Sequence, residues 1–160
     1  MSDEKKLAII ATKGSLDWAY PPFILSSTAA ALGYETEIFF TFYGLQLLRK
    51  NLALEVTPLG NPGMPMPMSM DKWFPVLLTA LPGMQSMMTA MMKKKMKSKG
   101  VASVEELREL CMEAEVKMIA CQMTVDLFDM PTNEFVDGIE YGGAATFFEF
   151  AGESDICLYI

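Results

Sequence analysis

Short apolar runs alternate with helical segments along this chain, and this alternation limits the folds that it can adopt. Residues 7–12 (LAIIAT) form a short apolar run that is typical of a buried strand. Residues 35–42 (ETEIFFTF) are rich in β-branched and aromatic residues and predict a second strand. Residues 16–32 between them have a helical pattern that ends at Gly33, with the regular helix expected from about Pro22. Strands that alternate with helices at this spacing predict an α/β fold with an open, mostly parallel sheet and helices on both faces.

The second half of the chain continues the pattern. Residues 103–106 form the capping box S-x-x-E, which predicts the start of a helix. Residues 116–120 form an apolar strand, and Cys121 follows at its carboxyl end. The other expected elements are a short helix at 44–50, a strand at 54–59, a short helix at 124–130, a turn at Gly142-Gly143, a helix at 144–151 and a strand at 155–160. The sheet is therefore expected to have about five strands.

A segment of unusual composition, residues 60–100, interrupts this order, and we expect it to be an insertion within one domain of 160 residues. Residues 60–70 hold three prolines and two glycines, residues 73–92 carry no charge, and ten of the fifteen methionines lie between Met64 and Met96. Methionine adapts to varied apolar shapes, so the segment predicts an oligomer or partner surface. The alternatives are contact with a membrane, by spanning or by peripheral binding, and soft-metal binding by the thioethers of residues 64–70.

Charge narrows the choice of partners. The chain is acidic, with a formal net charge of −7, which argues against nucleic-acid binding because the phosphate backbone attracts positive charge. The charge is uneven, since residues 101–160 hold 13 acidic and 2 basic residues, whereas five lysines lie within residues 93–99. That lysine cluster is either a solvated surface run or a docking patch for an acidic partner or an anionic membrane.

The cysteines and the lack of histidine decide which chemistry is available. There are three cysteines and no C-x-x-C pair, so the sequence predicts neither a disulfide framework nor a zinc site. The chain has no histidine, which excludes Ser-His-Asp and Cys-His catalysis, and we expect no metal and no organic cofactor. No apolar signal segment follows the charged residues 1–6, so a reducing cytoplasm is expected, with membrane association left open.

Cys121 is the best candidate for chemistry. Ligands of open parallel sheets bind beyond the carboxyl ends of the strands, and Cys121 lies at such an end, just before a short helix. Backbone amides at the start of a helix favour the thiolate, which is the nucleophilic form of cysteine. The competing interpretation is a small buried core residue.

The other candidate residues have structural alternatives as well. Cys111 lies on the apolar face of a helix and is expected in the core. Cys157 lies in the last strand, where it is either a core residue or a second thiol that resolves a persulfide or disulfide. Lys13, with Gly14 and Ser15, occupies the loop after the first strand and either stabilises a thiolate, binds an anion or is simply solvated.

Two motifs resemble one known family. Residues 120–126 (ACQMTVD) match a pattern A-C-x-M-[ST]-x-D, and residues 137–146 (DGIEYGGAAT) match D-G-[IV]-E-x-G-G-x-A-T. Both lie within residues 117–151, and together with residues 11–33 they resemble the DsrE/DsrF-like family, in the branch labelled DsrE-related or peroxiredoxin-like. The resemblance extends over nearly the whole chain. It implies a flavodoxin-like sheet, homo-oligomers and a role in sulfur relay, in which a cysteine accepts sulfane sulfur and passes it on.

Carried over by residue, the resemblance implies that Cys121 bears the sulfur as a persulfide and that a donor or acceptor protein is its partner. The residues implied to shape its pocket are Lys13, Gly14, Ser15, Gln122, Met123, Thr124, Gly142 and Gly143. A sulfurtransferase or sulfur carrier of this kind needs an accessible thiolate, an electropositive pocket and a partner surface. The first alternative is a non-catalytic oligomeric scaffold or membrane-docked adaptor that acts through the methionine-rich segment. The others are a small-molecule or nucleotide-binding domain and a redox enzyme that forms a disulfide at Cys121.

Overall fold

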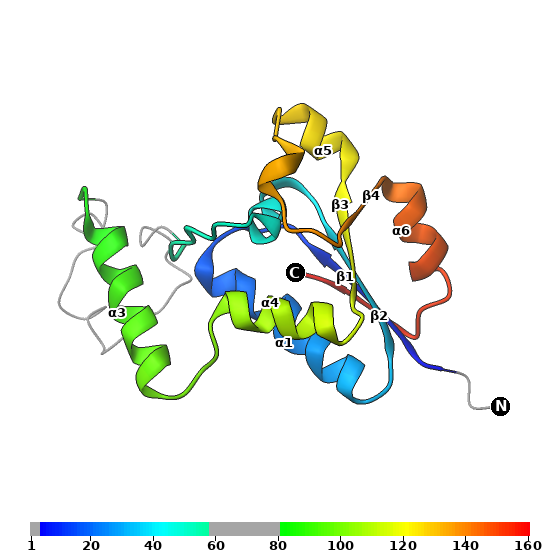
Figure 1. The fold of residues 1–160 in the computed structure, drawn as a ribbon, viewed down its shortest axis with the longest axis horizontal. Helices are drawn as coiled ribbons and strands as arrows, with labels where there is room; N and C mark the ends of the chain where they lie inside the picture. Colours follow the sequence, from blue (N-terminus) through cyan, green and yellow to red (C-terminus); the bar gives the residue numbers. More distant parts are fainter. Residues whose placement is uncertain (1–3, 58–80) are drawn as a thin grey trace. The chain divides into compact units, whose positions relative to one another are not determined.

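The computed structural model describes residues 4–57 and 81–160, which fall into two compact units. The first unit contains residues 4–14, 18–53 and 104–160, and the second contains residues 15–17, 54–57 and 81–103. The elements in chain order are β1 (Lys6–Ala11), α1 (Leu16–Ala31), β2 (Glu35–Phe40), the 3₁₀ helix η1 (Phe42–Leu48), α3 (Met84–Ser98), α4 (Val104–Glu113), β3 (Lys117–Cys121), α5 (Gln122–Leu127), the 3₁₀ helix η3 (Thr132–Glu134), β4 (Glu140–Gly142), α6 (Ala144–Ala151) and β5 (Ile156–Tyr159) (Figure 1).

The sheet of the first unit confirms the predicted α/β class. Its five strands are all parallel and lie in the order β4-β3-β2-β1-β5. The strand order of flavodoxin is 2-1-3-4-5. In both sheets the strands are added on one side of β1 first and then on its other side, so the order changes direction once. Parallel strands place all their carboxyl ends at one edge, so the residues that follow β1, β2, β3 and β4 meet there.

Helices cover both faces of the sheet, as Figure 1 shows: α6 lies on one side, and α1 and α4 lie on the other. On the α6 face, the ring of Phe147 packs 5.4 Å from the ring of Phe39, centroid to centroid. On the opposite face, the ring of Phe23 from α1 lies 6.0 Å from that of Phe40. Neighbouring residues of a strand point to opposite faces, so Phe39 packs in the core on one side of the sheet and Phe40 packs in the core on the other.

The predicted strand at 54–59 is wrong for the residues that the structure describes. Residues 54–57 belong to the second unit, where side chains of that unit satisfy their backbone groups. The amide of Val56 donates to the hydroxyl of Thr89 (3.0 Å), and the side-chain amide of Gln85 donates to the carbonyl of Val56 (2.9 Å). Side chains thus supply the backbone hydrogen bonds that a neighbouring strand would otherwise provide.

The fifth strand is instead β4, at a place where only a turn was expected. Its residues Glu140–Gly142 pair with Ile119–Cys121 at one edge of the sheet, and they form no buried apolar run. Helix α1 also differs from expectation, because it begins at Leu16 and continues through Pro21 and Pro22. Proline has a φ that is compatible with a helix but no N–H, so Pro21 and Pro22 cannot donate the usual helical hydrogen bonds and the helix proceeds without them.

Candidate functional site

Cys121 ends β3 and occupies the N-cap position of α5. On one side it pairs in register with Gly142 of β4. On the other side, Ala120 pairs with Phe40, so the next residue of that chain segment, Thr41, lies level with Cys121. Cys121 therefore lies at the carboxyl edge of the sheet, between a glycine and a threonine.

The side chain of Cys121 points to the α6 face and is buried. It is 4% exposed and belongs to an apolar cluster with Phe39, Ile119 and Phe147. An accessible thiolate was expected at this edge, and the structure shows a covered one. The cover includes Phe147 of α6, because that helix packs back over the strand after the turn at Gly142-Gly143.

The surroundings of the sulfur nevertheless favour the thiolate. Burial is the largest single influence and raises the pKa of Cys121, because it disfavours the charged form. Hydrogen-bond donors outweigh it: first the hydroxyl and amide of Thr124, then the hydroxyl of Thr41 and the amide of Met123. The α5 amides lie near the sulfur without the geometry of a capping hydrogen bond, and together with the two hydroxyls they hold the pKa of Cys121 below its usual value.

The two threonine hydroxyls beside the sulfur also contact each other. Their oxygen atoms lie 3.2 Å apart, and the amide of Phe42 donates to the Thr124 hydroxyl at 3.4 Å. Thr124 was among the predicted residues, whereas sequence reasoning missed Thr41. Its position at the carboxyl end of a strand could have indicated Thr41, as it indicated Cys121. The strand expected from the sequence extended to Phe42, however, so Thr41 was counted as an ordinary strand residue.

The structure places the remaining predicted pocket residues in different surroundings. The hydroxyl of Ser15, in the second unit, lies 3.1 Å from that of Thr57. Gln122 donates to the carboxylate of Asp126 at 2.7 Å, and the side chain of Met123 is largely exposed.

The Lys13 ammonium lies 3.2 Å from the centre of the Trp18 ring, a cation–π contact. The Lys13 ammonium thus lies against an aromatic ring, and the groups that lower the pKa of Cys121 are hydroxyls and backbone amides.

Two glycines near the site allow close approach. A Cβ on Gly14 would collide with the carbonyl oxygen of Tyr43, so Gly14 lets the loop after β1 pack on η1. A Cβ on Gly142 would lie 2.9 Å from the hydroxyl oxygen of Thr146, so this glycine lets the first turn of α6 pack beside Cys121. A Cβ on Gly143, the N-cap of α6, would have no close neighbour among residues 4–57 and 81–160.

The other two cysteines lie apart from Cys121. Cys111 is fully buried on the opposite face, where its thiol donates to the carbonyl of Phe23, and burial raises its pKa to about 11. Cys157 is exposed on β5, and its register through Ala8 and Glu37 places it level with Lys117, the first residue of β3. Cys157 is thus about 14 Å from Cys121 across the sheet and about 13 Å along it. A disulfide needs Cα atoms within about 7 Å, so the two cannot pair within this fold.

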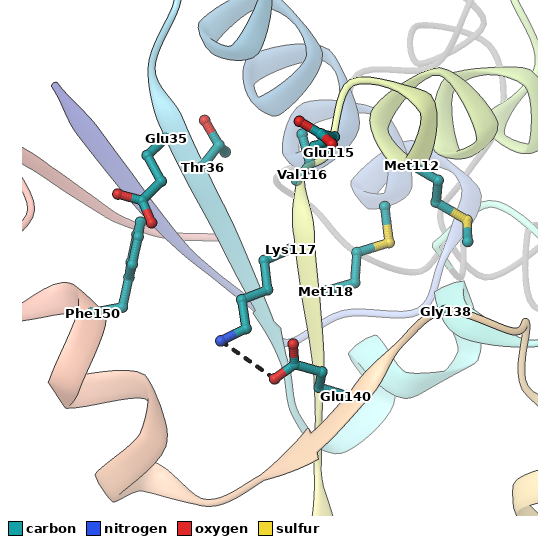
Figure 2. Close-up of a pocket in the computed structure, with 10 residues that line it drawn as sticks. All are labelled: Glu35, Thr36, Met112, Glu115, Val116, Lys117, Met118, Gly138, Glu140 and Phe150. Atoms are coloured by element: carbon teal, nitrogen blue, oxygen red, sulfur yellow. Dashed lines mark ion pairs between the residues drawn. The ribbon is translucent and has the colours of Figure 1, made fainter. Parts of the chain in front are cut away.

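A cavity of about 460 Å³ lies at the opposite end of the sheet, where the strands begin. The cavity lining is mainly acidic and apolar, and it includes Glu35, Glu115, Glu140, Phe150 and two methionines. Figure 2 shows that the side chain of Lys117, which also lines the cavity, points to Glu140. The cavity contains no cysteine, and ligands of parallel sheets bind at the carboxyl edge instead. We therefore keep Cys121 as the candidate site.

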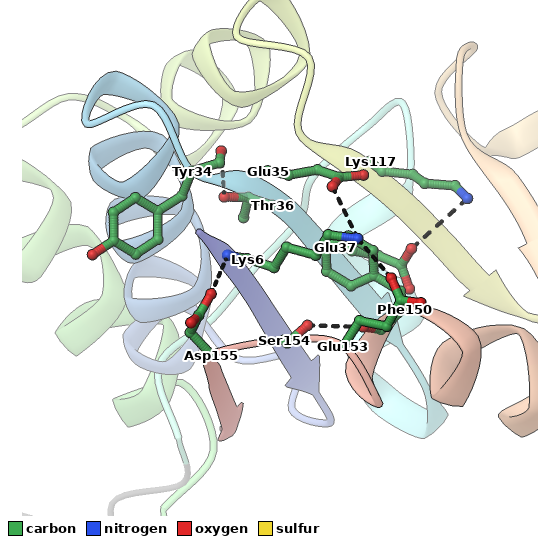
Figure 3. A network of polar contacts seen from close by, with 10 residues as sticks. All are labelled: Lys6, Tyr34, Glu35, Thr36, Glu37, Lys117, Phe150, Glu153, Ser154 and Asp155. Carbon is green, nitrogen blue, oxygen red and sulfur yellow. Dashed lines mark hydrogen bonds and ion pairs between the residues drawn. The ribbon is translucent and has the colours of Figure 1, made fainter. Parts of the chain in front are cut away.

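Beside this cavity lies a network of charged side chains on the α6 face (Figure 3). The Lys117 ammonium is 3.3 Å from Glu140 and 3.7 Å from Glu37, and the Lys6 ammonium is 2.9 Å from Glu153. Glu37 is only 1% exposed, and neither of its carboxylate oxygens has a hydrogen-bond partner among the described residues. Burial, partly offset by Lys117, raises the pKa of Glu37 to about 7.

Comparison with known proteins identifies the family. The DsrE/DsrF/DrsH-like family matches residues 3–159, which is almost the whole chain. The chain belongs to this family. That membership confirms the resemblance seen in the motifs around Cys121 and Gly142.

Individual members of the DsrE/DsrF/DrsH-like family agree with this. The chain is 85% identical over 158 residues to the sulfur carrier protein DsrE2 of Allochromatium vinosum, with 99% of both chains covered. It is 32% identical over 162 residues to the uncharacterized protein YrkE of Bacillus subtilis, with 98% of this chain and 97% of YrkE covered. The crystal structure of the ychN protein from E. coli has the same fold, with a TM-score of 0.55 at 12% identity over 98% of this chain and 99% of that one.

The methionine-rich segment of this family member is only partly described. In residues 4–57 and 81–160 no helix is both long enough and apolar enough to span a membrane. The predicted loop at 60–70, the soft-metal interpretation of residues 64–70 and the start of the uncharged segment at 73–80 lie outside the described residues. The described remainder includes α3, whose C-terminal half carries four of the five clustered lysines and whose C-cap is the fifth, Lys99.

Proposed function

We propose that this protein is a sulfur carrier that holds sulfane sulfur as a persulfide on Cys121 and passes it to a partner protein. The observation that carries the proposal is the 85% identity, over essentially the full length, to a protein named as a sulfur carrier. The lowered pKa of Cys121 supports this residue as the bearer of the sulfur, because the thiolate is the form that attacks.

The chemistry needs only thiols. The Cys121 thiolate attacks the outer sulfur of a donor persulfide R–S–SH, the S–S bond of the donor breaks, and the donor leaves as the thiolate R–S⁻. Cys121 then carries –S–SH. A thiolate of the acceptor attacks that outer sulfur in the same way and releases the Cys121 thiolate, so no outside oxidant or reductant is consumed.

The burial of Cys121 sets a condition on this transfer. At 4% exposure the sulfur is within reach of an incoming persulfide only when the cover over it moves. We infer that Phe147 and the first turn of α6 are that cover, because Phe147 shares the apolar cluster of Cys121 and the turn before α6 consists of two glycines. Docking of a partner at the carboxyl edge would supply the free energy for this displacement.

The partners of the carrier are a sulfur donor, a sulfur acceptor and further copies of the chain. Among the strands that the structure describes, β5 lies at the edge of the sheet and pairs with β1 alone, and Tyr159 on it is 74% exposed. An edge strand with exposed apolar side chains supports self-association. We place the carrier in the reducing cytoplasm, where its three free thiols persist, with the lysines of α3 available for peripheral contact with an anionic membrane.

Mass spectrometry of the intact protein tests the proposal. The protein is incubated with a sulfane-sulfur donor such as polysulfide, and wild type is compared with Cys121→Ser. A gain of one sulfur that disappears in Cys121→Ser, persists in Cys157→Ser and is reversed by a thiol reductant supports the carrier. No gain with any donor, or a gain that Cys121→Ser leaves unchanged, overturns it and favours a non-catalytic oligomeric scaffold.

A further inference from the structure

We propose that Thr41 is a positioning residue for the Cys121 sulfur, and that Thr41 and Thr124 form a hydroxyl pair that accommodates this sulfur as a thiol, a thiolate or a persulfide. The persulfide part of this proposal rests on the proposed function, whereas the thiol and thiolate parts do not. Nothing in the family motifs around Cys121 and Gly142 includes Thr41, which lies about 80 residues earlier in the chain.

The sheet holds Thr41 in place. Its backbone amide donates to the carbonyl of Ala11 at 3.0 Å, which continues the ladder between β1 and β2 by one residue. The register of β2 and β3 then places Thr41 level with Cys121, on the same face of the sheet. The position of the hydroxyl is therefore set by strand pairing and does not depend on a mobile loop.

The hydrogen bonds leave one of the two hydroxyl protons available to the sulfur. The amide of Phe42 donates to the oxygen of Thr124, so one acceptor site of this buried hydroxyl is already occupied. The oxygen atoms of Thr41 and Thr124 lie 3.2 Å apart, a distance that one proton can bridge, and the second proton then remains for the sulfur. Whichever hydroxyl donates to the other, the pair as a whole presents a donor to Cys121.

Hydroxyl groups give the site a property that backbone amides lack. An amide N–H can only donate, so the amides of Met123 and Thr124 favour the anion alone. A hydroxyl rotates, so it can accept the proton of a thiol or a persulfide and donate to a thiolate. A sulfur that changes between these forms in every transfer cycle therefore keeps a partner throughout.

The test is the pH dependence of the Cys121 thiolate in the full chain. Thr41→Val removes the hydroxyl and keeps the branched shape, and Thr41→Ser restores the hydroxyl. Thiolate formation is followed by ultraviolet absorbance, as the difference between each variant and the same variant carrying Cys121→Ser. Alkylation of Cys121 by iodoacetamide, resolved by peptide mass in a Cys157→Ser background, gives a second profile.

We expect Thr41→Val to move the titration midpoint of Cys121 to higher pH and to lower the alkylation rate at neutral pH by about 3- to 10-fold. At a pH above the midpoints of wild type and Thr41→Val, both thiols are ionised and the two alkylation rates should become equal. A variant that is only structurally damaged would differ from wild type at high pH as well. Thr41→Ser should restore the wild-type profile. The matched control is Thr36→Val, which removes another hydroxyl from the same strand, one that donates to the carbonyl of Tyr34.

A Thr41→Val midpoint equal to that of wild type, or a shift that Thr41→Ser does not reverse, overturns the proposal. The absorbance measurement does not require reagent access, so the burial of Cys121 leaves the test intact. Neither readout involves sulfur transfer. If Thr41→Val shifts the midpoint but the wild-type protein does not load sulfur, the hydroxyl pair is supported and the sulfur carrier is rejected. If the protein loads sulfur but the midpoint does not shift, the carrier is supported and the hydroxyl pair is rejected.

Discussion

Replacing the buried carboxylate of Glu37 should stabilise the protein, and the gain should depend on pH. Glu37 is 1% exposed beneath α6, and its nearest cation, the Lys117 ammonium, lies 3.7 Å away, beyond hydrogen-bond length. Burial is the main cause of the rise of its pKa from 4.5 to about 7. Ionisation of this group in the folded protein is therefore unfavourable, and Glu37→Gln removes the charge while keeping the shape.

The size and sign of the effect follow from the pKa difference. A folded-state pKa above the unfolded-state value means that the folded protein binds the proton more tightly, so stability from this group falls as pH rises from 4.5 through 7. Each pKa unit is worth about 1.4 kcal/mol, so ionised Glu37 costs about 3 kcal/mol above pH 7. We expect Glu37→Gln to be more stable than wild type by about 3 kcal/mol near pH 8 and by less than about 1 kcal/mol near pH 5.

Thermal unfolding of both proteins across this pH range measures the difference. For a chain of this length, about 3 kcal/mol corresponds to a rise in Tm of roughly 6 to 12 °C. The matched control is Glu35→Gln, because Glu35 lies on the same face of β2 but its side chain is 51% exposed, and its Tm should change little at either pH. A stability difference between Glu37→Gln and wild type that is the same near pH 5 and pH 8 would refute the reasoning.

Four further predictions test the packing of the fold. Gly142→Ala should lower stability by about 1 to 3 kcal/mol in urea unfolding, because the new Cβ meets Thr146, and Thr146→Ala should recover part of the loss. Phe147→Ala should cost about 3 kcal/mol and increase the rate at which Cys121 is alkylated; an unchanged rate would show that α6 is not its cover. Arg108→Leu should lower the free energy of unfolding by about 2 to 4 kcal/mol in the same assay, because the carbonyls of Leu47 and Arg49 lose the guanidinium that donates to them. Cys111 should resist alkylation near pH 8, where a pKa of about 11 leaves only about one thiol in a thousand ionised; rapid labelling in the folded protein would contradict its burial.

Local patterns predicted the central part of the fold well. β1, β2 and β3 are largely buried, and each contains a short run of buried apolar residues that is visible in the sequence. β4 is a three-residue strand at the edge of the sheet with exposed residues, and it exists only because β3 offers it a partner. No local pattern could separate it from the turn that the two glycines suggest.

Residues 54–57 show the opposite error. Their apolar side chains match a strand pattern, and Leu54 and Val56 are indeed buried. The burial takes place in the second unit, where Thr89, Gln85 and Asp17 bind the backbone. Hydrophobic periodicity reports that a segment is buried, but it does not report which partner its backbone will find.

The sequence by itself determined that this is a parallel α/β protein with a cysteine at the end of a strand and a helix start after it. These features depend on residues close together in the chain, where apolar runs, glycines and capping residues act directly on the local backbone. Only the tertiary structure decided that Thr41 lies beside Cys121, that Phe147 covers the sulfur, that Cys157 is out of its reach and that Glu37 is buried without a hydrogen bond. Each of these depends on strand order and register, which are set by contacts between residues far apart in the chain and leave no local pattern in the sequence.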